Sequence, residues 1–153
     1  MLDLLFRDTI TVFCRSVENG AIFWYPRVIK NTHAVISSGA SSTTRGASNT
    51  DNGMVHIMYS GGRDGACIGK YLYVLPKAWA ALTPDKKEKS ITFTTGEDFG
   101  FWMKGSFTEQ GPISDESFRD GFYNYMNKKY DDVFAIAQCT QSYIIPHFEL
   151  VAK

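Results

Sequence analysis

The sequence predicts a mainly β or α+β fold, a small β-barrel or sandwich against which one helix of the C-terminal half packs. Several short segments alternate apolar and polar residues, which is the period of a half-buried strand. Aromatic residues make up 14% of the chain and often stand beside β-branched residues, a combination that suits a pleated surface. The 153 residues suffice for one core, and we expect a single domain over residues 1–153.

The first two strands are expected to form a hairpin-like pair. Residues 9–15 alternate and place Ile10, Val12 and Cys14 on one face. Asn19-Gly20 then provides a tight turn, and residues 23–36 resume with aromatic and β-branched side chains. Pro26 lacks a backbone N–H, so its part of the second strand should lie at an edge or a bulge.

Residues 37–53 form a long segment that is almost wholly small and polar, with no apolar face to bury. A loop of this length in a compact domain is usually either functional or disordered, and the sequence leaves both alternatives open. In the functional alternative the loop orders against a neighbouring subunit. The residues we select for that contact are Ser41, Thr44, Arg45, Asn49 and Asp51, among which Arg45 is the segment's only cation and Asp51 its only anion.

The middle of the chain alternates again. Residues 54–59 place Val55, Ile57 and Tyr59 on one face, and the glycine-rich residues 61–65 end this strand as a turn. That turn lacks the Gly-Lys-Ser/Thr ending of a phosphate loop and the spaced acids of a calcium loop. The segments that follow are a strand at 71–75, a helical turn from Pro76 to Leu82, a charged surface link at 84–89, and strands at 91–95 and 99–104.

One helix is expected over residues 114–130. Ser114 can cap it, acids follow the cap, and lysines occupy the last turn, where they suit the helix dipole. Phe118, Phe122 and Tyr125 form one stripe that should lie on the sheet. Gly121 inside this helix costs about 1 kcal/mol relative to alanine. Two final strands, 133–138 and 147–151, follow with turns at 131–132 and 143–146.

Composition argues against several classes of function. The 16 basic and 16 acidic residues cancel, so no net field attracts nucleic acid or anionic lipid. The three histidines, His33, His56 and His147, show no metal-binding spacing, and a metal site would have to be assembled entirely by the fold. We therefore assign no metal and no cofactor, and we interpret His56 as an outward strand residue.

The three widely spaced cysteines, Cys14, Cys67 and Cys139, favour neither a disulfide framework nor a zinc knuckle and fit folding in a reducing cytosol. The N-terminus carries Asp3 and Arg7 and does not resemble a signal peptide. No apolar run has the length of a membrane span, so we expect a soluble protein with no membrane partner.

No catalytic constellation is recognisable, and we assign no catalytic residue. The sequence has no Gly-x-Ser-x-Gly elbow, and adjacent acids such as Glu97 and Asp98 point to opposite faces of a strand. The aromatic and basic residues of 99–104 could stack on single-stranded nucleic acid, although sheet packing explains their alternation equally well. The protein is therefore expected not to be an enzyme.

Four stretches carry a resemblance to a known family. They are YVLPKAW at 73–79, the segment 98–105 with its WMKG, KKYDDVFAI at 128–136, and PHFELVAK at 146–153. Their order and spacing are similar to those of small proteins encoded in the capsid and neck region of phages and prophages of Gram-positive bacteria. Residues 8–13 and 24–29 also look like the opening of such proteins and of the head-closure proteins of tailed phages. The apolar residues 143–146 depart from this pattern, in which a more polar link is expected.

The resemblance implies a structural virion protein made in the host cytoplasm. Such a protein is a subunit of a homo-oligomeric neck ring that helps to close the head and dock the tail. Its partners are the portal or adaptor protein and tail proteins. A passive contact with packaged DNA in the channel is compatible with this role. The alternatives are a tail-terminator or tail-completion protein and, from other classes, a small hydrolase or a nucleic-acid-binding module.

Overall fold

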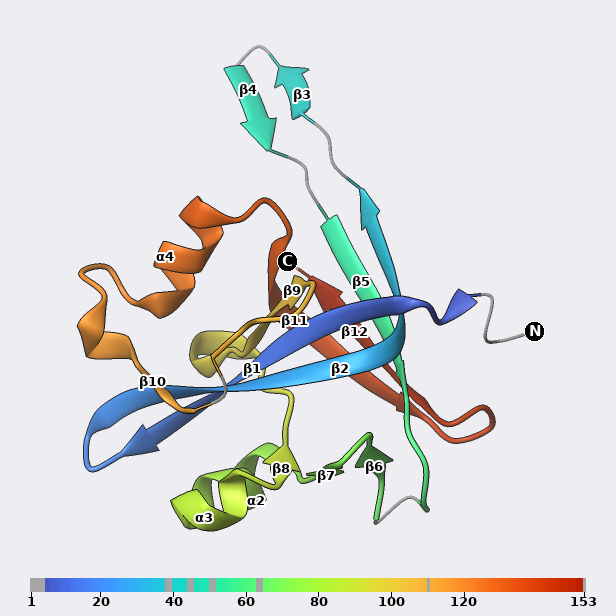
Figure 1. Cartoon of the computed structure of the whole chain (residues 1–153). Helices are drawn as coiled ribbons and strands as arrows, with labels where there is room; N and C mark the ends of the chain where they lie inside the picture. The colour runs from blue at the N-terminus through green and yellow to red at the C-terminus, as the bar shows by residue number, and fades with distance from the viewer. Residues whose placement is uncertain are drawn as a thin grey trace.

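The computed structural model describes residues 5–37, 40–43, 46–49, 52–62, 65–109 and 111–152, with the backbone alone for 40–43 and 46–49. Six antiparallel strands follow one another in the order β1-β9-β11-β12-β5-β2, and β2 pairs back with β1 to close a barrel (Figure 1). The strands are β1 (Asp8–Glu18), β2 (Ala21–Ser37), β5 (Asn52–Met58), β9 (Phe101–Lys104), β11 (Val133–Ser142) and β12 (His147–Ala152). The predicted mainly β fold is confirmed, and of the two predicted forms the barrel is the one observed.

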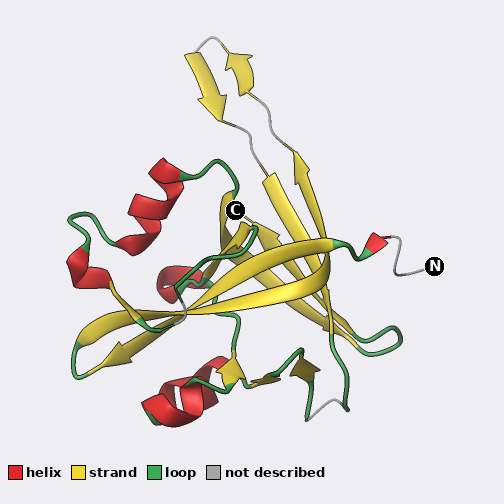
Figure 2. Ribbon diagram, in the orientation of Figure 1, coloured by secondary structure: helices red, strands yellow, loops and turns green. Residues whose placement is uncertain are grey.

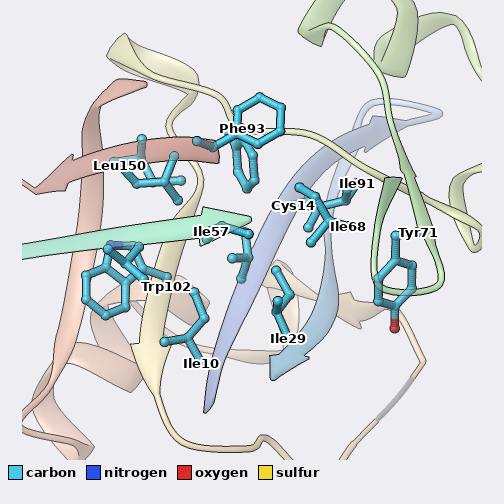
Figure 3. Packing of buried hydrophobic residues seen from close by; sticks show 14 of the residues in the cluster. Ile10, Cys14, Ile29, Ile57, Ile68, Tyr71, Ile91, Phe93, Trp102 and Leu150 are labelled. Atoms are coloured by element: carbon cyan, nitrogen blue, oxygen red, sulfur yellow. The ribbon is translucent and has the colours of Figure 1, made fainter. Parts of the chain in front are cut away.

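The barrel interior is filled by apolar side chains. Ile10, Val12 and Cys14 point inward from β1, as the alternation predicts, and each is at most 1% exposed. Val55 and Ile57 do the same from β5. Figure 3 shows Ile10, Cys14 and Ile57 in the same core as Ile29, Trp102 and Leu150 from other strands. Such a small barrel has room for packed side chains and no lumen for a ligand.

A second apolar core lies on the outer side of the barrel, under α4 (Phe122–Lys129). Phe13 points outward from β1 and stacks on Phe101 of β9, with ring centroids 4.6 Å apart. Phe122 and Met126, one turn apart on α4, are both 1% exposed and cover this pair. The middle of β1 is therefore buried on both faces, which explains the run of three apolar residues Val12, Phe13 and Cys14.

The predicted helix over 114–130 is wrong in extent. Residues Asp115–Ser117 form the 3-10 helix η2, and α4 begins only at Phe122. Between them Gly121 has φ 88° and ψ 156°, a conformation that is nearly restricted to glycine. Ser114 makes no side-chain capping bond and instead belongs to the short strand β10 (Ile113–Ser114), which pairs with β2. Asp115 does serve the helix start, because its Oδ1 accepts a hydrogen bond from the Phe122 N–H at 2.9 Å.

A smaller unit covers one side of the barrel. It contains the sheet β6-β7-β8 and two short helices (Figure 2). Its elements are β6 (Cys67–Ile68), β7 (Tyr71–Tyr73), α2 (Pro76–Ala81), α3 (Pro84–Lys87) and β8 (Ser90–Ile91), followed by the 3-10 helix η1 (Gly96–Asp98). The helix expected at Pro76 is confirmed, and its Trp79 is buried and donates to the Arg15 carbonyl at 2.8 Å. The predicted strand at 91–95 is wrong beyond Ile91, because β8 pairs with β7 over only two residues.

The charged surface link predicted at 84–89 is exposed except at Lys87, and its first four residues form the helix α3. Lys87 is 2% exposed, and its Nζ lies 2.6 Å from Ser16 Oγ and 3.7 Å from Glu18 Oε2 of β1. Arg27 of β2 is also buried, at 4% exposure, and donates from Nε to the Ser90 carbonyl at 2.7 Å. These two cations fasten α3 and β8 to the barrel through paired polar groups.

Within the polar segment predicted as a loop, the structure describes a second hairpin that lies between β2 and β5 in the chain. The strands β3 (Ala40–Thr43) and β4 (Gly46–Asn49) pair only with each other in the part of the backbone that the structure describes. We call residues 40–49 the arm. Figure 1 shows the arm standing clear of the barrel at the end where β2 leaves it and β5 enters it. The prediction of an irregular loop is therefore corrected for these two strands.

None of the described helices has the length and hydropathy needed to cross a membrane.

Candidate functional site

The arm contains four of the five residues that the sequence singled out for subunit contact, and the fifth, Asp51, follows it in the chain. Ser41 pairs with Ser48, and Asn49 pairs with Ala40, so Ser41 and Asn49 lie near each other on opposite strands of the arm. Thr44, Arg45 and Asp51 lie outside the described residues. Each strand of a two-stranded sheet has one unpaired edge, and such an edge can accept or donate a further strand.

Strand β2 offers an open edge of its own. It pairs with β10 at Phe23 and Trp24 and with β5 from Thr32 onward, and between them its described neighbour is β1 alone. Pro26 lies in this stretch, which confirms the edge position expected for it. An extra residue at Asn31, with φ 58°, bends the strand between its two partners.

A groove of about 1050 Å³ follows this open edge. The barrel side of the groove is the stretch of β2 from Tyr25 to Asn31, and the opposite side is formed by the turn between β6 and β7 and by Glu88 and Lys89. Lysines and glutamates both line it, so the groove has no single sign of charge. An extended polar chain is the shape that fits a groove along an unpaired strand.

The hollows described on this surface hold no nucleophile beside a base. Neither the groove nor a second hollow of about 420 Å³ near Trp79 and Asp98 is lined by histidine or cysteine. The aromatic platform considered for nucleic acid is also contradicted, because Phe101 and Trp102 are both 0% exposed. Those rings belong to the two cores and present no stacking face to solvent.

The outer face of β2, β5 and β12 brings together residues that are far apart in sequence. His33 of β2 pairs with His56 of β5, and His56 pairs with Glu149 of β12. His147 lies two residues before Glu149 on the same face. Ring centroids are 5.6 Å apart between His33 and His56 and 5.4 Å apart between His56 and His147. We call these four residues the histidine face.

The protonation of the histidine face follows from its surroundings. Burial lowers the pKa of His56 below 6.5, and the neighbouring His147 and His33 lower it further, against the opposing effect of Glu149. His147 Nδ1 lies 2.7 Å from the carbonyl oxygen of Ile145. A carbonyl only accepts, so Nδ1 is the donor, and in the neutral tautomer that makes this bond Nε2 is the nitrogen with the lone pair.

The loop between β11 and β12 presents apolar side chains to solvent. Ile144 is 99% exposed and Ile145 is 54% exposed. Tyr59 holds the base of the loop, since its hydroxyl donates to the Ser142 carbonyl at 2.8 Å and its N–H donates to the Pro146 carbonyl at 3.2 Å. The turn predicted at 143–146 is confirmed, and its apolar residues form a supported, exposed tip.

Comparison with protein-family models, curated proteins and solved structures gives no significant match to this chain.

Sequence reasoning missed the histidine face and the open groove. His33, His56 and His147 each occupy an outward position of an alternating strand, so their common side of the barrel was accessible to prediction. Their mutual contact was not, because it depends on the register of three strands that are joined by segments of very different length. The same holds for the buried Lys87, whose charged neighbours are typical of a solvated surface.

Proposed function

We propose that this chain is a non-enzymatic structural subunit of a tailed-phage particle, a head-tail connector that forms a neck ring, helps to close the head and docks the tail. The observation that carries the proposal is the arm, a hairpin that stands clear of the closed barrel (Figure 1). In the described backbone this hairpin pairs only with itself and lies outside the barrel, so it adds nothing to the barrel core. Its natural use is contact with another chain.

The open edge of β2 supplies a binding site that matches the arm. The arm of one copy presents unpaired strand edges, and the groove along β2 of the next copy presents another. Pairing of unlike surfaces is a heterologous contact, and repetition of such a contact closes into a ring when the rotation allows it. The proposal is therefore a ring in which each arm adds a strand to the neighbouring barrel.

The loop at 143–146 is a second candidate contact, for the portal, the adaptor or the tail. An exposed isoleucine on a supported loop gains by burial about as much as any single aliphatic side chain, roughly 2 kcal/mol. The loop and the arm belong to different hairpins, so each of them can contact a different partner. Zero net charge favours at most passive contact with DNA in the channel.

The residues behind the resemblance fit this kind of protein. Trp79, Trp102 and Phe148 lie in the stretches that resemble phage neck proteins, and all three are at most 2% exposed. They form the fold and no catalytic site, which supports a shared fold and setting.

The first test is mass analysis of purified particles that have been separated into heads and tails. A neck protein is expected on heads at a copy number typical of a ring. Presence on tails alone would favour the tail-terminator or tail-completion alternative, and absence from both fractions would contradict a virion role.

The second test removes the arm. Deletion of residues 41–49 should leave the melting temperature of the purified chain within about 2 °C of the wild type, since local surface changes alter stability by little. Incorporation of the shortened chain into particles should be lost. Normal incorporation would exclude the arm as the joining element, while a collapse in melting temperature would show that the arm belongs to the fold.

A further inference from the structure

We propose that His56, His147 and Glu149 form a binding site for a divalent transition-metal ion, with Zn²⁺ as the ion that fits best, on the outer face of the barrel. This site is independent of the role in phage assembly proposed above. One ligand atom from each of the three residues lies within 4.8 Å of the other two. All three side chains are half-buried, so the site is both supported by the sheet and open to solvent.

The barrel register creates the cluster. Glu149 faces His56 directly across the β5–β12 pair, and His147 faces Met58 in the same ladder. Because side chains alternate between faces along a strand, His147 and Glu149 both lie on the side of His56. A rigid antiparallel pair therefore holds two imidazoles and one carboxylate together without a flexible loop.

The distances are close to those that a metal requires. Zinc binds histidine nitrogen and carboxylate oxygen at about 2.0–2.2 Å, which places tetrahedral ligands about 3.3 Å from one another. His56 Nδ1 and Glu149 Oε2 are already 3.9 Å apart. A ligand atom of His147 lies within 4.8 Å of a ligand atom of each of the other two residues, so small side-chain rotations would bring all three into one coordination sphere.

His147 is arranged as metal-binding histidines usually are. Its Nδ1–H donates to the Ile145 carbonyl at 2.7 Å, which fixes the tautomer and leaves Nε2 available. His33 stacks on the ring of His56 at an interplanar angle of 19° and lies outside the three-ligand group.

The donor set selects the metal class. Two imidazoles and one carboxylate suit zinc and its first-row neighbours, whereas calcium and magnesium prefer oxygen alone. Three protein ligands leave one coordination position free, and on this outer face it is open to water. A bound ion would join β5, which follows the arm, to β12, which follows the apolar loop.

The test is calorimetric titration of the full chain with ZnCl₂ after removal of any histidine tag. Wild type should bind one equivalent with saturation. His56→Ala and His147→Ala should each weaken affinity by more than about tenfold, since even loss of an outer hydrogen-bond partner weakens metal sites by roughly 10- to 100-fold. Glu149→Gln should weaken affinity in the same direction.

Two matched controls identify the ligands. His33→Ala removes a histidine of the same face, and Cys67→Ser removes a partly exposed thiol that is an alternative zinc ligand. Both should bind zinc within about threefold of wild type. Loss in either control as large as that in His147→Ala would overturn the assigned ligand set, and wild type without saturable binding would overturn the site.

A measurement on wild type alone tests the site even if some of the variants fail to fold. Zinc should shift the side-chain NMR signals of His56 and His147 strongly and that of His33 weakly. Equal shifts in all three, or none, would contradict the proposal. Because this experiment needs no particle, its result is separate from the outcome of the assembly tests.

Discussion

At the scale of single residues, the barrel interior leaves no space for a side chain at Gly53. A Cβ built there would lie 2.7 Å from Cγ of Phe134, a residue that is itself 5% exposed and packs on Trp102. Gly53 occupies an inward position of β5, two residues before Val55. Glycine here therefore provides the volume that the Phe134 ring fills.

We expect Gly53→Ala to lower the free energy of unfolding by about 1–3 kcal/mol, because it overpacks the core. The control is Gly62→Ala, where a Cβ would meet nothing within 4 Å and where the change should be close to zero. Urea unfolding of both variants compares them. Similar stability of the two variants would show that the barrel end accommodates a methyl group at position 53 without strain.

Glu18 gives stability that depends on pH. Burial alone raises its pKa, but hydrogen bonds from Tyr25 and Ser16 and the charge of Lys87 outweigh burial and hold the pKa below the ordinary 4.5. A group with a lowered folded pKa stabilises the fold above its unfolded pKa and loses that contribution as pH falls through the folded value.

The stability advantage of wild type over Glu18→Gln should therefore be constant above pH 4.5 and shrink below it. Chemical unfolding across this pH range measures the difference. Glu116→Gln, on the exposed surface, serves as the control and should differ little from wild type at any pH. A constant difference between wild type and Glu18→Gln down to low pH would contradict the assigned bonds.

At the scale of elements, Gly121 decides how the segment from 115 to 129 folds. If the segment were one helix, alanine at 121 would stabilise it by about 1 kcal/mol. In the observed structure the residue has φ 88° and ψ 156°, and a side chain there is strained by roughly 1–3 kcal/mol. A continuous helix therefore predicts that Gly121→Ala raises the stability of the protein, whereas the observed conformation predicts that it lowers the stability.

We expect Gly121→Ala to destabilise the protein. Thermal unfolding gives the sign directly, and Gly111→Ala, where a Cβ would meet nothing within 4 Å, is the control. A stabilised Gly121→Ala variant would mean that the continuous helix forms in solution.

Strands with a period of two were predictable, whereas segments that depend on distant partners were not. The alternation in β1 and β5 correctly gave the inward positions Val12 and Val55, since burial on one side imposes the period. The strand expected at 91–95 failed because strand pairing needs a partner, and β7 is only three residues long. The helix failed because the backbone angles of a glycine leave no mark on the apolar pattern.

At the scale of the whole molecule, the sequence left barrel and sandwich undecided. Closure depends on β9 pairing with both β1 and β11 and on β2 pairing with both β1 and β5, and no local pattern specifies these partners. The histidine face and the groove are products of that closure. Neither site could therefore be predicted from the pattern of residues. The arm could be identified, because its segment has no apolar face to bury.

We expect Ile144→Lys to change the free energy of unfolding by less than about 0.5 kcal/mol, because the side chain is 99% exposed. Its incorporation into particles should fall, because a buried contact with a partner would then contain a charge. Val17→Lys, at a residue 53% exposed elsewhere on the barrel, is the matched control for both measurements. Equal incorporation of the two variants would exclude the loop as a contact surface.

The continuity of the arm with β2 and β5 has a mechanical consequence. A tension applied to the arm pulls both strands along their own axes, and each is held on its far side by a parallel row of hydrogen bonds, to β1 and to β12. Loaded in shear, such rows yield together and not one bond at a time. The two strands that flank the arm in the chain are therefore held in a way that resists extraction along their length.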